Sequence, residues 1–298
     1  MTSLVEIYRR FPDREAAVAH LGHVRWPNGF SCPSCGADTV ARKTEKGQAD
    51  RLQCWSCKRS FSATVGTIFH NSHIDLQRWF LLISLMLNAK KGLSAMQAAR
   101  DLEMRRPTVW SMMHRIRAAL VDDGALLSGL VEMDEAYVGG KPRRANRKDD
   151  HDPKPPGRGT SKTPVIGAVE RGGRVKAKAV QSTDLTGDDL EALAREMIAP
   201  RGSSLTTDEY RGYSRFNNFI AHRTVNHSRE YVSADLFGKL HINTIESFWA
   251  ILKRAIIGQF HHVSRKYLPL YLREIVYRYN MRRRGWNLNG VLHLAIKP

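Results

Sequence analysis

Val131-Glu132-Met133-Asp134-Glu135-Ala136-Tyr137-Val138 is the stretch around which the rest of the chain can be interpreted. Val131, Met133 and Val138 are apolar and Tyr137 suits a pleated sheet, so the stretch predicts a buried strand. Asp134 interrupts the apolar pattern. A carboxylate inside a core strand is costly unless it is paired, hydrogen-bonded or bound to a metal ion. Asp134 is therefore the first candidate for a functional residue.

Two later acids lie in similarly unusual settings. Asp208 ends a strand-like run at 204–207, and Glu246 lies inside an apolar helix expected over 242–257. Three acids on two strands and one helix predict a site that holds a pair of divalent cations. From spacing alone an alternative stays open, in which these acids are surface charges or ion-pair partners.

The composition indicates a folded protein with a polyanionic partner. The 298 residues suffice for two or three domains, and 42% hydrophobic with 26% charged residues is typical of globular chains. Lys plus Arg number 47 against 29 acids, which gives a net charge of 47 − 29 = +18. This excess favours nucleic acid as the partner, with an anionic membrane surface second. A ribosome-associated or merely basic soluble protein remains an alternative.

The sequence also predicts a compartment. Residues 1–6 lack the pattern of a signal peptide. The longest apolar run, 79–87, is well short of the ~20 residues that a membrane span needs. All four cysteines lie between positions 32 and 57, which leaves none for a disulfide framework elsewhere. We expect a soluble protein in the reducing cytoplasm, with no membrane partner.

The cysteines form a doubled motif that is typical of a zinc site. Cys32-Pro-Ser-Cys35 is followed, eighteen residues later, by Cys54-Trp-Ser-Cys57. This spacing predicts two knuckles joined by a β-hairpin around one structural zinc ion, because four thiolates leave no open coordination position. A disulfide pair or a redox motif is the alternative, which the cytoplasmic setting and the doubling disfavour. Whether such a ribbon would contact DNA or protein stays open.

The segment 75–120 has apolar residues at helical spacing throughout. A helix that begins after Ser94, a turn at 103–107 and a helix at 108–120 resemble a helix-turn-helix, and a plain helical linker is the alternative. The expected DNA contacts of this region are Arg105, Arg106, Thr108, Ser111 and Arg115.

A basic, Pro- and Gly-rich insert follows at 140–163. It has eight basic residues against three aspartates. We expect a loop that becomes ordered on a phosphate backbone, although a solvated linker is equally compatible with this composition. The expected contacts there are Lys141, Arg143, Arg144 and Arg147.

The remaining pattern predicts a mixed α/β domain. Strands are expected at 163–170 and 174–182, up to Asp208, and around 222–225, with helices at 184–197, 242–257 and 266–279. This order suggests a mixed sheet flanked by helices, as in ribonuclease H-like folds. In the helix at 242–257, Asn243, Glu246 and Lys253 fall on one stripe and are expected at the same site.

These residues suit phosphodiester cleavage. Two Mg²⁺ ions about 3.5–4 Å apart stabilise the attacking and leaving oxygens in such reactions, and Mg²⁺ prefers carboxylate, water and phosphate oxygens. Asp134 would bridge the ions at the sheet centre, while Asp208 and Glu246 would each hold one side. Lys253 would contact the phosphate near the cut.

Four segments together resemble the DDE transposases of bacterial insertion sequences, in particular the ISXO-like group with an N-terminal zinc ribbon. They are 25–36, 131–141, 207–213, and 243–254 with Tyr279 and Asn280. The resemblance implies a ribonuclease H-like catalytic domain in which Asp134, Asp208 and Glu246 are the acidic triad and Lys253 is the basic residue after it. Some relatives carry Asn in place of the last acid, whereas this chain has Glu.

The resemblance further implies two Mg²⁺ or Mn²⁺ ions per site, and terminal inverted repeats and target DNA as partners. It also implies assembly as a dimer or larger on DNA, at the bacterial nucleoid. Asn243 and Arg254 are further expected DNA contacts. We expect a helical lead-in and zinc ribbon at 1–70, the helical DNA-binding region at 71–124 and the catalytic domain at 125–298. Two other functions stay open: a DNA-binding regulator whose catalytic fold is silent, and a metal-dependent nuclease without strand transfer.

Overall fold

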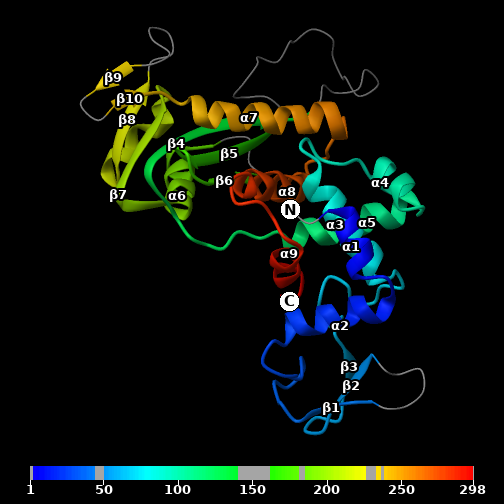
Figure 1. Cartoon of the computed structure of the whole chain (residues 1–298). Helices are drawn as coiled ribbons and strands as arrows, with labels where there is room; N and C mark the ends of the chain where they lie inside the picture. The colour runs from blue at the N-terminus through cyan, green and yellow to red at the C-terminus, as the bar shows by residue number, and fades with distance from the viewer. Residues whose placement is uncertain are drawn as a thin grey trace, which may run out of the picture. The chain divides into compact units, whose positions relative to one another are not determined.

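The computed structural model describes residues 3–43, 50–139, 162–180, 185–225, 233–235 and 238–297. The chain forms two compact units (Figure 1). One comprises Met1–Val121 together with Met281–Pro298, and the other comprises Asp122–Asn280.

The first unit is mainly helical. Asp13 caps the second helix by accepting a hydrogen bond from the backbone N–H of Ala16 at 2.8 Å. Ser94 caps the helix predicted after it in the same way. Phe11, Trp79 and other buried aromatic side chains pack edge to face in the core. The helices are α1 (Leu4–Arg10), α2 (Arg14–Arg25), α3 (Leu76–Asn88), α4 (Ala95–Asp101), α5 (Arg106–Ala119) and α9 (Leu288–Ala295).

A small antiparallel sheet completes the first unit. Its strands are β1 (Val40–Arg42), β2 (Arg51–Cys54) and β3 (Ser60–Ser62), in the order β1-β2-β3. The predicted hairpin between the two cysteine pairs is thus present as β1 and β2, and β3 adds a third strand.

The C-terminal segment differs from the sequence expectation. We expected residues 281–298 to belong to the catalytic domain, but they pack with the N-terminal unit. The backbone N–H of Ile68 donates to the carbonyl of Ala295 at 3.1 Å, and the Trp286 indole donates to Asn88 Oδ1 at 3.1 Å. The physical reason is the apolar face of α9, which is buried within this unit. A break at residue 70 is not seen either, because residues 1–121 form one compact unit.

The second unit is built on a five-stranded mixed sheet. Its strands are β4 (Leu127–Val138), β5 (Thr163–Glu170), β6 (Val175–Ala179), β7 (Ile198–Asp208) and β8 (Ala221–Val225). The strand order is β6-β5-β4-β7-β8. β5 pairs antiparallel with both of its neighbours, β4 and β6. β7 pairs parallel with both of its neighbours, β4 and β8. This is the predicted ribonuclease H-like order, with the first strand of the unit at the centre. A separate hairpin pairs β9 (Ser233–Asp235) with β10 (Gly238–Leu240).

Helices cover both faces of this sheet. On one face α7 (Asn243–Ala255) and α8 (Leu268–Met281) pack on alternate residues of β4, β5 and β6, and α7 is the orange helix in Figure 1. On the other face α6 (Gly187–Met197) and the 3-10 segment η2 (Arg211–Asn218) pack on the intervening residues. A π-helical turn, η3 (Ile256–Phe260), ends α7. The sheet therefore has two cores, one on each face, and successive residues along β4 and β5 alternate between them.

Candidate functional sites

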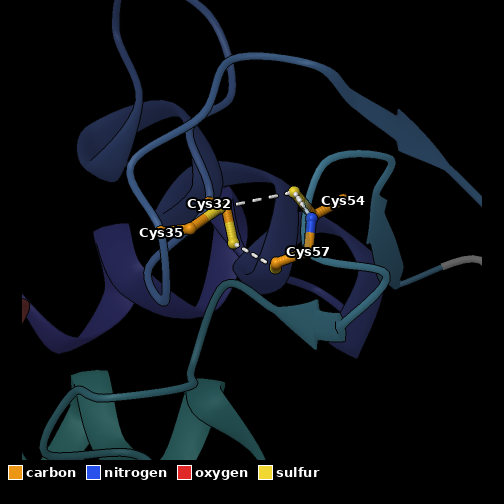
Figure 2. Close-up of side chains that lie close together, drawn as sticks. All are labelled: Cys32, Cys35, Cys54 and Cys57. Atoms are coloured by element: carbon orange, nitrogen blue, oxygen red, sulfur yellow. Dashed lines mark hydrogen bonds between the residues drawn. The ribbon is translucent and has the colours of Figure 1, made fainter.

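The four cysteines come together at one end of the small sheet. Their Sγ atoms all lie within 4.8 Å of one another. The Cys32–Cys57 and Cys35–Cys54 sulfur distances are 3.6 and 3.7 Å (Figure 2). A tetrahedral zinc ion with Zn–S bonds of about 2.3 Å requires sulfurs about 3.8 Å apart. The cluster therefore fits a closed, structural zinc site.

The backbone around Cys32 and Cys54 favours their thiolates. The N–H of Ser34 donates to Cys32 Sγ at 3.4 Å, and the N–H of Cys57 donates to Cys54 Sγ at 3.5 Å. Burial raises the pKa of the Cys32 thiol, but the N–H of Ser34 and the neighbouring cysteines more than offset it and lower this pKa to about 6. The thiolate is the form that binds metal. Gly36, with φ of +76°, permits the tight turn after the first pair.

Asp134 and Asp208 occupy equivalent positions on neighbouring strands. The parallel ladder between β4 and β7 pairs Val131 with Leu205 and Glu132 with Thr206. Two residues further along each strand are Asp134 and Asp208, at the end where the ladder stops. Both side chains are half-buried. Because Leu205 packs in the core on the α6 side, the residues at even positions here face α7.

α7 carries the third acid over this face of the sheet. Glu246 lies in the first turn of α7 and is exposed. One turn later the indole N–H of Trp249 donates to Asp134 Oδ2 at 3.0 Å. Asn243 and Lys253 are exposed on the same helix, and so is Arg254. The predicted stripe is thus present on a helix that contacts the strand of Asp134.

The three carboxylates are less compact than the thiols. In the described part of the chain, the four cysteines form a compact cluster of possible metal ligands. Their ligand atoms all lie within 4.8 Å of one another, and the three acids are not part of such a cluster. A two-ion site does not need such compactness. With ions about 3.5–4 Å apart and Mg–O bonds of about 2.1 Å, carboxylates that hold opposite ions can lie about 8 Å apart. The chemistry of the donor set, which is all oxygen, fits Mg²⁺ or Mn²⁺.

Two residues beside the acids were not singled out from the sequence. Trp249 falls on the apolar face of its helix and Glu132 falls within its strand, so the local pattern does not mark either as a site residue. Each had a signal. A buried indole N–H needs an acceptor, and Glu132 shares its strand face with Asp134 by the two-residue period. Glu132 is fully buried and accepts hydrogen bonds from the first turn of α7.

The residues of the helical region that are predicted to contact DNA differ in their exposure to solvent. Arg105, Arg106 and Ser111 are exposed, and Thr108 is half-buried, at the start of α5. Arg115 instead contacts its own unit, where it donates to the carbonyl of His70 at 2.6 Å and lies over the Trp79 ring. The basic insert, including Lys141, Arg143, Arg144 and Arg147, lies outside the described residues except for its last two positions.

Comparisons with known proteins show the family of the chain. Residues 126–280 match the family described as ISXO2-like transposase domain, and residues 12–60 match the transposase zinc-ribbon domain. An uncharacterized protein in transposable element ISH50 of Halobacterium salinarum is 31% identical over 288 residues, which cover 91% of this chain and 92% of that protein.

Two solved structures are distant matches. The pre-cleavage Mos1 transpososome has a TM-score of 0.23 at 11% identity, over 70% of this chain and 79% of that one. The Mos1 strand transfer complex has a TM-score of 0.20 at 13% identity, over 69% and 77%. Structural similarity with TM-scores this low carries no argument about the fold or function of this chain.

The fold and the cysteine site define a zinc-ribbon protein with a ribonuclease H-like domain. With both matches, the chain belongs to the ISXO2-like transposase family. No helix among the residues that the structure describes is long and apolar enough to cross a membrane.

Proposed function

We propose that this transposase binds the terminal inverted repeats of an insertion sequence, cleaves DNA at the element ends and joins them to target DNA. The observation that carries the proposal is the equivalent placement of Asp134 and Asp208 on neighbouring parallel strands, under a helix that bears Glu246. Family membership supports the same reaction class. Two ends must be handled together, so we also propose a dimer or larger assembly on DNA.

In this proposal the three carboxylates are metal ligands. Asp134 would hold both ions, while Asp208 and Glu246 would each hold one. When bound, two Mg²⁺ or Mn²⁺ ions stabilise charge on the attacking and leaving oxygens of an in-line displacement. The ammonium group of Lys253 would neutralise the phosphate beside the cut.

The chemistry has two displacements at phosphorus. First, the oxygen of a water molecule forms a bond to phosphorus at the element end, the bond to the 3′ oxygen breaks, and a 3′-hydroxyl leaves. Then that 3′-hydroxyl attacks a phosphodiester of target DNA, a new P–O bond forms, and the target 3′ oxygen leaves. The exposed guanidinium groups of Arg105, Arg106 and Arg254 would bind the phosphates of the DNA backbone. The exposed amide of Asn243, on the same helix as Arg254, would be a further DNA contact.

The test uses purified full-length protein, Mg²⁺ and a labelled duplex carrying the terminal sequences of the element that encodes the chain. We expect Asp208→Asn to lower cleavage by roughly a thousandfold, since a lost ligand removes several kcal/mol of charge stabilisation, and to leave end binding intact. The matched control is Glu209→Gln, which removes the adjacent exposed carboxylate and should cleave like the parent.

Three results would contradict the proposal. Equal loss in both variants would argue against a specific ligand role for Asp208. Nicked ends that accumulate and never join target DNA would indicate a nuclease without strand transfer. End binding without any cleavage by the parent chain, in either Mg²⁺ or Mn²⁺, would indicate a DNA-binding regulator.

A further inference from the structure

Trp249 makes a specific polar contact with the strand that carries Asp134. Its side chain is 4% exposed, and its indole N–H donates to Asp134 Oδ2 at 3.0 Å. It follows Glu246 by three residues on α7, so the two side chains are neighbours on the helix surface. One contact therefore links the Asp134 carboxylate to the turn that bears Glu246.

A glycine on the next strand makes room for this indole. Gly167 of β5 pairs directly with Asp134 in the antiparallel ladder. A Cβ at Gly167 would lie 2.6 Å from Cη2 and 3.0 Å from Cζ2 of Trp249. The backbone of Gly167 is not in the left-handed region. A glycine inside a strand weakens it, so close approach of the ring is the physical reason for this one.

A second contact holds the start of α7 on the same strand. The buried carboxylate of Glu132 accepts from the N–H groups of Thr244 at 2.8 Å and Ile245 at 3.1 Å, and from Thr244 Oγ1 at 2.9 Å. Arg171 pairs with it at 2.8 Å. Glu132 thus closes the N-terminus of the helix, where backbone N–H groups lack helical partners.

The spacings of the two contacts match. From Thr244 to Trp249 the helix rises about 7.5 Å, and from Glu132 to Asp134 the strand advances about 6.7 Å. Two contacts at matched spacing prevent α7 from sliding or rotating on β4. Glu246 lies between them in the chain.

We infer that Trp249, seated over Gly167, is a positioning residue that orients the Asp134 carboxylate and sets the register of α7 for metal binding. The inference rests on the proposed function. Partners that orient metal ligands typically change metal affinity or activity by about 10–100-fold when they are removed. Trp249 acts through its hydrogen bond to Asp134.

The first experiment measures Mn²⁺ binding to the DNA-free protein by electron paramagnetic resonance of the free ion. We expect Trp249→Phe to remove the N–H together with the outer ring of the indole, and to weaken Mn²⁺ binding about tenfold or more. The Mg²⁺ concentration for half-maximal cleavage should rise in parallel, with end binding unchanged. The matched control is Trp286→Phe, which removes an indole hydrogen bond to Asn88 in the other unit and should leave Mn²⁺ affinity unchanged.

A second variant keeps the inference testable if Trp249→Phe does not fold. Gly167→Ala retains the indole but displaces it, and should weaken Mn²⁺ binding similarly. In the double variant the smaller ring leaves space for the new methyl group, so its affinity should match that of Trp249→Phe alone. Folded single variants that bind Mn²⁺ within twofold of the parent would overturn the inference.

The outcome is separable from that of the proposed function. Asp134→Asn is measured beside the other variants. If this substitution leaves Mn²⁺ affinity unchanged, the metal site itself is wrong. If it abolishes binding while Trp249→Phe and Gly167→Ala do not weaken it, only the positioning role of Trp249 fails.

Discussion

Glu132 shows how one buried charge organises the second unit. Its side chain has 0% exposure, and it pairs with Arg171, whose side chain is 21% exposed. Arg171 also donates to the carbonyl of His241, just before α7. A buried carboxylate is stable only with such a complete set of partners. Glu132 therefore contributes by placing α7, and removing its charge leaves its partners unsatisfied.

We expect Glu132→Gln to lower the free energy of unfolding by about 2–3 kcal/mol, because the Arg171 pair and one acceptor of the helix N-terminus are lost. Urea denaturation measures this, and hydrogen exchange of the α7 amides should accelerate. The control is Glu191→Gln, which breaks an i,i+4 pair with the half-exposed Arg195 and should cost only about 0.3–0.5 kcal/mol. Equal urea midpoints for the two variants would contradict the role of Glu132.

At this scale the sequence predicts Asp134, Asp208 and Glu246 as candidate site residues, because charge in an apolar pattern is visible locally. The contact between Trp249 and Gly167 could not be predicted from the sequence. Eighty-two positions separate them, and the ring meets the glycine only after α7 has packed on β5.

The zinc ribbon is the element whose structure the sequence predicted most directly. The spacing of the cysteine pairs, together with the turn glycine, already specifies the knuckles. The strands β1 and β3 have three residues each, too few to hold a core of their own. The ribbon should therefore depend on its metal.

We expect Cys54→Ser to reduce the zinc content from about one ion per chain to none, because Cys54 is a fully buried ligand. Proteolysis should then cleave the ribbon while α7 and its sheet stay protected. Zinc content is measured by atomic absorption. Ser34→Ala is the control, since its backbone N–H to Cys32 is retained. Full zinc content in the Cys54 variant would rule out the four-thiolate site.

Elements with weak local signals were less predictable. The helix α9 was not predicted. α9 has only eight residues, and its place in the N-terminal unit depends on contacts from nearly 230 residues earlier in the chain.

For the whole molecule, the +18 net charge is the dominant physical property. The exposed Arg105 and Arg106 at the start of α5 contribute to it. Counterions released from DNA by such groups make affinity depend steeply on salt.

We expect affinity for element ends to fall by about a thousandfold or more between 50 and 200 mM salt, as six or more phosphate contacts require. Arg106→Ala should reduce the log–log slope by about one. Arg195→Ala, on α6, is the control with the same charge change and should keep the slope. Fluorescence anisotropy with a labelled end duplex measures both, and a flat salt response would argue against phosphate binding.

The sequence by itself predicted the four clustered cysteines, the strand and helix faces and the acids that stand out from them, because these patterns depend on residues a few positions apart. Only the tertiary structure decided that Asp134 is level with Asp208, that Trp249 contacts Asp134 above Gly167, and that the C-terminal helix joins the N-terminal unit. Strand register and helix docking arise from burial between distant segments, and no local pattern encodes them.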